Sequence, residues 1–158
     1  MGAIATIGVY DSSLDDFLGK LRRHKVEMIL DVRQRRGVRG PQYAWANSLR
    51  LQGALRNAGI AYQHRPELAP TTELRQLQYR EDDRLGVGKR SRVELAEEYR
   101  RRYLAEILDR VDLQDILESL PVERTSALLC VERDARACHR SLIAARLHDQ
   151  FALRVVNL

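Results

Sequence analysis

The chain has 158 residues, of which 31% are charged and 44% apolar, a composition typical of one ordinary globular domain. A domain of this length can fold without a disulfide or a structural metal, and two cysteines are too few for a disulfide framework. No apolar run reaches the ~20 residues of a membrane span, and the N-terminus lacks the features of a secretory signal. We therefore expect a cytoplasmic protein with reduced thiols and no membrane partner.

The net charge of +5 is concentrated in one part of the chain. Residues 32–66 include no acidic residue, and all seven basic residues there are arginines: Arg33, Arg35, Arg36, Arg39, Arg50, Arg56 and Arg65. Arginine binds phosphate and carboxylate groups through paired hydrogen bonds. The pattern indicates an anion-binding or nucleic-acid-binding surface, although a solvated basic face would have the same composition.

Short apolar runs predict five strands, with helical periods between them. The expected strands cover residues 3–9, 26–32, 60–64, 125–131 and 152–156. The second run, VEMILDV, is apolar on both faces, as expected for a buried parallel strand. The alternation favours a three-layer, Rossmann-like α/β fold, with a mainly parallel sheet of about five strands and helices on both faces.

The helices are predicted from apolar positions at helical spacing and from their capping residues. They are expected after an N-cap at Ser12, over 43–58, around 74–79, over 93–111 behind a capping box at 91–94, after Asp112, and over 135–150. No internal repeat or low-complexity tract interrupts this order. We expect one domain over residues 1–158, with a helical insertion at about 66–122.

Polar side chains follow the ends of the predicted strands. In a parallel sheet these ends meet at one rim, outside which ligands bind. We expect the cationic and imidazole groups at this rim to hold an anion: Arg33, Arg39, His64 and Arg140. The groups that could carry catalysis there are Asp31, Glu132, Cys138 and His139.

The stretch CHR, residues 138–140, comes where a loop gives way to an apolar helical period. If the helix begins near Ala135, all three residues lie in its first turn, where free backbone N–H groups and the helix dipole favour anions and thiolates. This predicts an anion-binding helix start with a reactive Cys138 or an acid–base His139. The structural alternative is a buried cysteine, a capping histidine and a surface arginine.

A phosphatase loop is a weaker interpretation of the same region. Cys130 and Arg136 have the C-x5-R spacing of a cysteine-dependent phosphatase, in which a thiolate lies under a ring of N–H groups. Glu132 and Asp134 lie within the loop, which contains no glycine. Two carboxylates would repel a phosphate dianion, so the pattern disfavours this chemistry.

A metal site is the other weak alternative. Cys130, Cys138, His139 and His64 could together form a zinc set. However, C-x7-C with an adjacent histidine is not a common ligand spacing, and adjacent residues of a helix point about 100° apart. We therefore predict no metal and no other cofactor.

Three further side chains have open roles. Asp31 and Glu132 could orient a substrate hydroxyl or act as general bases, or they could form ion pairs with nearby arginines. Trp45 follows the arginine-rich loop and could stack on a base. Packing of Trp45 on the core is the favoured interpretation.

Five segments together resemble the domain-of-unknown-function 488 family. In chain order they are TIG (6–8), DVR (31–33), LRNAGIAYQH (55–64), LLCVERD (128–134) and CHR (138–140). The resemblance covers most of the chain apart from about 65–125, and it implies an α/β, Rossmann-like domain. Functional proposals for that family favour nucleic acids or nucleotides, so the resemblance implies a ligand of this class.

The chain departs from the family pattern in three places. The family usually has a His and a Ser or Thr directly after TIG, whereas this chain reads VYDS at 9–12. Arg36 and Val38 stand where Pro and Ser are common, and Leu-Ala at 68–69 replaces Leu-Gly. If the missing His and Ser carry chemistry in relatives, the resemblance implies a weakened or altered activity here.

The chain contains no P-loop, G-x-G-x-x-G, C-x-x-C, G-x-S-x-G or H-E-x-x-H motif, which argues against the common ATPase, dinucleotide, thioredoxin, hydrolase and zinc-protease classes. Our first hypothesis is an enzyme acting on a phosphate-bearing substrate, a nucleotide or nucleic acid. The second is a non-catalytic binding module for the same ligands. The third is a domain in which these residues are only structural. The sequence indicates neither the bond broken nor an oligomeric state.

Overall fold

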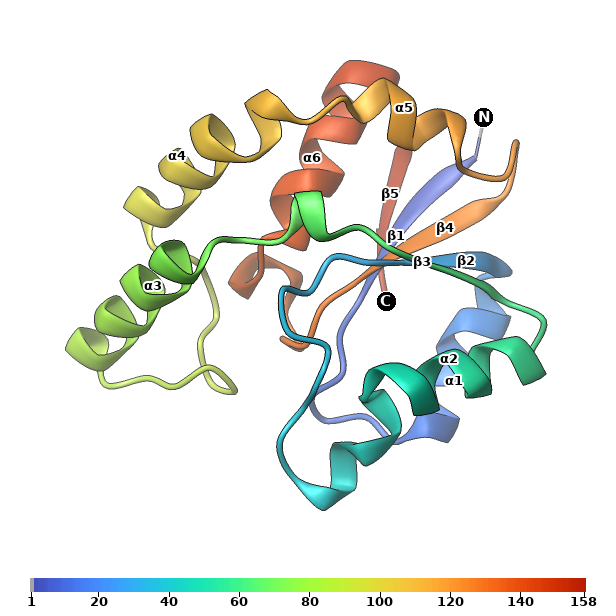
Figure 1. The fold of residues 1–158 in the computed structure, drawn as a ribbon, viewed down its shortest axis with the longest axis horizontal. Coiled ribbons are helices and arrows are strands. Elements are labelled where there is room, and N and C mark those ends of the chain that lie inside the picture. The colour runs from blue at the N-terminus through green and yellow to red at the C-terminus, as the bar shows by residue number, and fades with distance from the viewer. Residues whose placement is uncertain (1) are drawn as a thin grey trace.

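The computed structural model describes residues 2–158 and has the predicted α/β architecture. Five strands form one parallel sheet in the order β3-β2-β4-β1-β5, where β1 is Ala3–Ile7, β2 Val26–Asp31, β3 Ala61–His64, β4 Thr125–Leu129 and β5 Arg154–Asn157. Helices α1 (Leu14–Arg23) and α2 (Ser48–Asn57) cover one face, and α6 (Arg140–Phe151) covers the other (Figure 1). The predicted three-layer, Rossmann-like fold is confirmed.

The segment between β3 and β4 is mostly helical. It contains α3 (Thr72–Leu85), α4 (Glu97–Glu106) and α5 (Leu113–Glu118). Figure 1 shows α3 and α4 beyond the carboxyl ends of the strands. The Tyr103 hydroxyl donates to the Leu68 carbonyl at 2.6 Å, which anchors α4 to the segment after β3. Nowhere in residues 2–158 is a helix both long and apolar enough to cross a bilayer.

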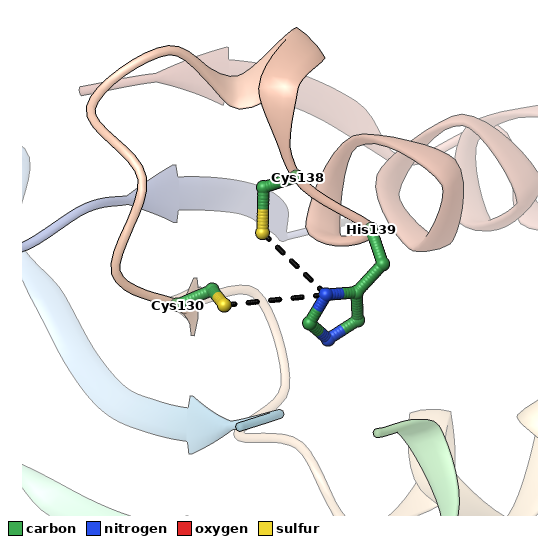
Figure 2. A group of neighbouring side chains, drawn as sticks. All are labelled: Cys130, Cys138 and His139. Atoms are coloured by element: carbon green, nitrogen blue, oxygen red, sulfur yellow. Dashed lines mark hydrogen bonds between the residues drawn. The ribbon is translucent and has the colours of Figure 1, made fainter. Parts of the chain in front are cut away.

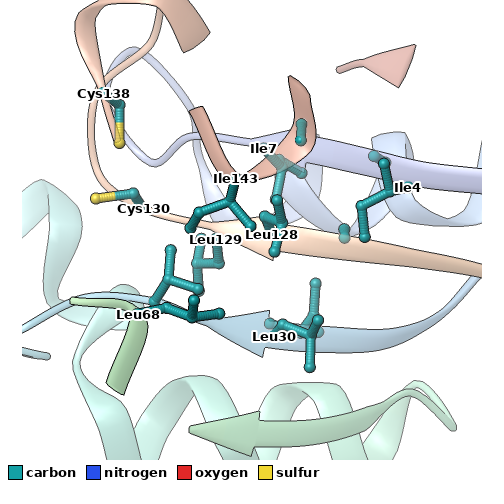
Figure 3. Packing of buried hydrophobic residues seen from close by; sticks show 14 of the residues in the cluster. Ile4, Ile7, Leu30, Leu68, Leu128, Leu129, Cys130, Cys138 and Ile143 are labelled. Atoms are coloured by element: carbon teal, nitrogen blue, oxygen red, sulfur yellow. The ribbon is translucent and has the colours of Figure 1, made fainter. Parts of the chain in front are cut away.

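The central strand of the sheet is β4, and its position decides what lies at the rim. It pairs with β2 on one side and β1 on the other, so Cys130 emerges between the ends of those two strands. The Cys130 N–H donates to the Ile7 carbonyl at 3.3 Å. Apolar side chains from β1, β2, β4 and α6 form a core that extends to Cys130 and Cys138 (Figure 3).

Gly8, directly after β1, allows two loops of the rim to touch. A Cβ built on Gly8 would lie 2.1 Å from the carbonyl oxygen of Glu132, far inside van der Waals contact. Because Gly8 has no Cβ, the two loops can approach closely, and the N–H groups of Val9 and Tyr10 both donate to the Val131 carbonyl at 3.0 Å. Gly8 therefore holds the loop after β1 against the loop after β4.

Local hydrogen bonds correct several predicted helix boundaries. Ser13 caps α1 in place of Ser12, because its hydroxyl accepts the N–H of Asp16 at 3.1 Å. A 3-10 turn at Pro41–Ala46 precedes α2, which therefore starts at Ser48, five residues after the predicted start. The helix expected around 74–79 is longer, since α3 extends to Leu85.

The capping box predicted at 91–94 does not form. The Ser91 hydroxyl instead accepts the N–H of Gly88 at 2.9 Å, closing a turn in the loop between α3 and α4. The long helix predicted over 93–111 is therefore shorter, and α4 starts only at Glu97.

The last helix also begins later than predicted. Asp134 caps a 3-10 turn at Ala135–Ala137, and α6 starts at Arg140. Between them Cys138 has an extended backbone, with φ −140° and ψ 148°. Cys138, His139 and Arg140 therefore do not share the first turn of one helix, and the expectation that their side chains diverge by helical spacing is wrong.

Candidate anion-binding cavity

A cavity of about 690 Å³ opens at the rim, beyond the carboxyl ends of β2 and β4. Its sheet side is formed by the loop after β2, by residues 130–132 after β4 and by residues 137–139 before α6. Its other side is formed by α3 and by the loop between α3 and α4. The cavity lies at the rim predicted from the strand ends, and the helical insertion supplies half of its wall.

The lining of this cavity is strongly basic. Seven cationic side chains line it: Arg33, Arg35, Arg39, Arg75, Lys89, Arg90 and Arg92. Among the described residues, Glu132 is the single acidic one in the lining. An enclosed surface with this excess of positive charge attracts anions.

Lys89 and Arg90, in the loop between α3 and α4, have no carboxylate as a direct partner. Neither of them forms an ion pair within 4.0 Å in the described part of the chain. Burial acts to lower the pKa of Lys89, but the combined charges of nearby groups, of which Glu132 contributes most, raise the pKa above its ordinary value. Arg90 lies over the rings of Tyr10 and Tyr43, at 5.1 and 5.2 Å from their centroids. Both side chains therefore place positive charge beside the cavity without a direct counterion.

Asp31 and Arg33 form a closed ion pair under the cavity. The Asp31 carboxylate is fully buried and accepts the Arg33 Nε–H at 2.9 Å and the Nη2–H at 2.8 Å. The Tyr62 hydroxyl donates to the same carboxylate at 2.5 Å. Burial acts to lower the pKa of Arg33, and the bonds and charge of Asp31 more than offset it. Arg33 lines the cavity, but Asp31 does not.

Glu132 belongs to a second buried ion network, which joins the sheet to the insertion. Arg92 donates through Nη2 to Glu132 Oε1 at 2.9 Å and through Nη1 to Asp82 of α3 at 2.6 Å. The other oxygen of Glu132, Oε2, is buried and has no hydrogen-bond partner among the described residues. Burial, followed by the charge at Cys130, raises the pKa of Glu132, against the opposing effect of Lys89 and Arg92. Glu132 is thus a partly paired carboxylate with one unused oxygen.

The structure does not place Arg140 in the cavity, where it was predicted to hold an anion. It is 1% exposed and lies outside the cavity lining. Its Nη1 donates to the Glu132 carbonyl at 2.7 Å, and its Nη2 donates to the Arg133 carbonyl at 3.2 Å. Arg140 therefore braces the loop between β4 and α6 from inside.

Cys130, Cys138 and His139 converge on one point of the cavity wall (Figure 2). The Cys138 Sγ lies 3.5 Å and the Cys130 Sγ 4.0 Å from His139 Nδ1. The other ring nitrogen, Nε2, lies 2.7 Å from the carbonyl oxygen of Val32. A carbonyl oxygen can only accept, so Nε2 carries a proton, and in its neutral form the ring offers the Nδ1 lone pair to the two thiols.

The geometry argues against the C-x5-R phosphatase loop. Arg136 is 78% exposed in its side chain and pairs with Asp134 at 3.2 Å, outside the cavity lining. A hydrogen bond with Cys138, together with burial, raises the pKa of Cys130 to about 12. A thiol with that pKa is protonated at neutral pH and is a weak nucleophile.

The remaining predicted residues divide between the cavity and the core. Arg39 is exposed and lines the cavity, as expected of an anion contact. His64 is half-buried and outside the lining, with Nε2 at 3.2 Å from the Arg33 carbonyl. Trp45 packs on Phe17 of α1, with ring centroids 5.0 Å apart, and does not line the cavity. The core role favoured for Trp45 agrees with this packing.

Several lining residues were missed because they come from the insertion. Arg75, Lys89, Arg90 and Arg92 belong to the segment between β3 and β4, of which no residue was predicted at the rim. A usable signal was present, since the run GKRSR at 88–92 has three cations in a glycine-containing loop. Nothing in the sequence pairs that run with the strand ends.

The comparison with protein families agrees with the resemblance and includes four of the five segments, since TIG at 6–8 lies before the matched region. The model of the family described as Domain of unknown function DUF488 matches residues 13–147, most of the chain. The chain belongs to the DUF488 family. No curated protein and no solved structure gives a significant match.

The structure gives a physical reason for three of the five segments in this DUF488 chain. TIG ends at Gly8, where only a residue without a Cβ fits. DVR contributes the buried Asp31–Arg33 pair, and CHR contributes two groups of the Cys130 cluster together with the brace at Arg140. Tyr10, in the segment where the family usually has a His and a Ser or Thr, lines the cavity.

Proposed function

We propose that this DUF488 protein binds a phosphate-bearing ligand, a nucleotide or the end of a nucleic-acid strand, in the basic cavity. The observation that carries the proposal is the lining, in which seven cationic side chains surround about 690 Å³ with one acidic residue among those described. Arginine suits phosphate because its planar group donates two parallel hydrogen bonds. The cavity volume lies within the ~300–1,000 Å³ of small-molecule sites.

Aromatic side chains favour a nucleoside over inorganic phosphate alone. Tyr10 packs against Tyr43 with ring centroids 5.4 Å apart, and Arg90 lies over both rings. On the opposite wall Tyr79 lies below the guanidinium of Arg75, at 5.7 Å. Bases stack on such surfaces with a gain of about 1–3 kcal/mol each. A ligand with both phosphate and base would use both kinds of group.

The proposed reaction centres on Glu132. Its carboxyl has a raised pKa, lines the cavity and keeps Oε2 unpaired within the described structure. A carboxyl of this kind can accept or donate a proton during attack on a phosphate ester or a glycosidic bond. Asp31 has a positioning role in this proposal, because it holds Arg33 in the cavity wall.

The test is binding of labelled mononucleotides and short single-stranded oligonucleotides across a salt series. Phosphate contacts predict that log K falls linearly with log salt. Arg90→Ala should weaken binding, whereas Arg56→Ala, exposed on α2 outside the cavity, should not. Absence of binding at low salt for both ligand classes would falsify the proposal.

A non-catalytic binding module is the second candidate, favoured by the ion pair that already occupies Glu132 Oε1. The two functions separate when bound nucleotides and oligonucleotides are incubated with the protein and analysed for products. Products that form with the wild type and not with Glu132→Gln identify an enzyme. Ligands recovered intact, with unchanged affinity in Glu132→Gln, identify a binding module.

A further inference from the structure

We propose that Cys130, Cys138 and His139 form a site for a borderline-soft divalent ion such as Zn²⁺, with its open coordination position on the basic cavity. The three ligand atoms, two Sγ and one Nδ1, all lie within 4.8 Å of one another. All three residues are buried and all three line the cavity. This site goes beyond the proposed phosphate binding, since it needs no ligand in the cavity to form.

The distances fit a tetrahedral site. With Zn–S bonds of ~2.3 Å and Zn–N bonds of ~2.0–2.1 Å, sulfur and nitrogen ligands of one tetrahedral ion lie about 3.6 Å apart. The two observed Sγ–Nδ1 distances are 3.5 Å for Cys138 and 4.0 Å for Cys130. An ion could therefore be held with only small side-chain shifts.

The backbone explains how adjacent residues supply two ligands. On a helix Cys138 and His139 would point about 100° apart, and this is one of the two reasons for which the sequence predicts no metal, the other being the uncommon ligand spacing. Cys138 is extended, with φ −140° and ψ 148°, and only His139 lies at the start of α6. Figure 2 shows the sulfur atoms of both cysteines directed at Nδ1 of the His139 ring.

The imidazole is prepared for metal binding by its second nitrogen. Nε2–H donates to the Val32 carbonyl at 2.7 Å, which fixes the tautomer and leaves the Nδ1 lone pair directed at the sulfurs. Metal-bound histidines almost always donate their other N–H to such an acceptor. The Val32 carbonyl lies directly after β2, so the rim that forms the cavity also orients this ligand.

Charge and access favour a site with an open position. Binding of the ion releases the protons of the two thiols to solvent, and the resulting thiolates balance the charge of a divalent ion, so the surrounding arginines do not oppose its binding. Three protein ligands leave a fourth position for water or substrate, as in catalytic zinc sites with two cysteines and one histidine. Glu132, two residues after Cys130, also lines the cavity and keeps Oε2 unpaired within the described chain, so a metal-bound water would have an acceptor available.

The test is a titration of the reduced, metal-stripped full chain with Co²⁺, which replaces Zn²⁺ and reports its ligands by absorption. We expect sulfur-to-cobalt charge transfer and tetrahedral d–d bands that saturate at one ion per chain and disappear on addition of Zn²⁺. Cys130→Ser and Cys138→Ser should each reduce the charge-transfer absorption by about half, since each removes one of two thiolates. His64→Gln is the matched control and should leave the spectrum unchanged, because His64 lies outside the cluster.

The proposal falls if Co²⁺ gives no charge-transfer band, or if the Ser variants keep the full wild-type band. Should a Ser variant fail to fold, X-ray absorption on the zinc-loaded wild type decides. Two sulfur neighbours with lighter atoms support the site, and a shell of only oxygen and nitrogen overturns it. These readouts contain no nucleotide, so they stand or fall separately from the proposed phosphate binding.

Discussion

The strand ends and the loops around the cavity use cationic side chains in opposite ways. At the strand ends, Arg33 in the cavity wall and Arg140 behind it are 2% and 1% exposed, and their donors are directed to Asp31 and to loop carbonyls. In the loop of the insertion, Arg90 is exposed and Lys89 half-exposed, and neither has a carboxylate partner within 4.0 Å in the described structure. The arginines at the strand ends therefore shape the rim, whereas the cations of the insertion, together with the exposed Arg35 and Arg39 of the loop after β2, can meet a ligand.

This contrast has an electrostatic cause. A buried guanidinium must have its charge and hydrogen bonds satisfied inside the protein, so an arginine at a central strand end is drawn into a local pair. A loop beyond the strand ends stays in contact with water and can leave its cations unpaired. Buried arginines at the strand ends thus build the cavity, and the insertion, together with Arg35 and Arg39, supplies the charge for binding.

The largest expected effect is on stability, at Arg92. This residue belongs to the insertion but, like Arg33, it is buried and forms ion pairs. Arg92→Leu leaves the buried carboxyls of Asp82 and Glu132 without their common partner. Removing one partner of a buried ion network costs about 3–5 kcal/mol, which urea unfolding would measure. The control is Arg124→Ala, because Arg124 pairs with Glu27 on the surface and should leave the unfolding midpoint unchanged. Equal midpoints for both variants would contradict the network.

The next effect is at Asp31 and distinguishes a positioning residue from a catalytic one. Asp31→Asn keeps the shape but removes the charge that Arg33 and Tyr62 bind, so the free energy of unfolding should fall by about 1.5–3 kcal/mol. In the folded variant, we expect the affinity for the ligand to change, because Arg33 loses the charge that holds it in the cavity wall. A variant with wild-type stability and no turnover would make Asp31 catalytic and contradict the positioning role.

Gly8 tests the contact between the two rim loops. Gly8→Ala forces a Cβ against the Glu132 carbonyl, and overpacking of this kind costs about 1–3 kcal/mol in thermal or urea unfolding. Gly53→Ala is the matched control, because Gly53 lies inside α2 with nothing within 4 Å of the added Cβ. There alanine should raise stability by up to about 1 kcal/mol. Destabilisation of similar size at both positions would mean that helix propensity and close contact are not the causes.

These two sides also explain what the sequence could predict. The fold followed from apolar runs such as VEMILDV, because a parallel strand buried on both faces leaves a readable pattern. The rim followed from the predicted parallel sheet, whose strands all end at one edge. The strand order, which brings the ends of β2 and β4 together, came only from the structure. The partner of Arg92 was not predictable, since Glu132 lies 40 residues away and only packing of the insertion joins them. The convergence of Cys138 and His139 was missed for a local reason, the extended backbone before α6.

The smallest effect on stability and the clearest on binding is expected at Lys89. Lys89→Met keeps the length of the side chain and removes a cation that forms no ion pair within 4.0 Å, so the free energy of unfolding should change less than in the variants above, while affinity for a phosphate-bearing ligand falls. If Lys89 contacts a phosphate, the slope of log K against log salt should decrease by about 1. Lys20→Met is the matched control, because Lys20 lies in the last turn of α1, outside the cavity, and should leave both the affinity and the salt slope unchanged. A Lys89 variant with the wild-type salt slope would show that Lys89 makes no phosphate contact, although it lines the cavity without a direct counterion.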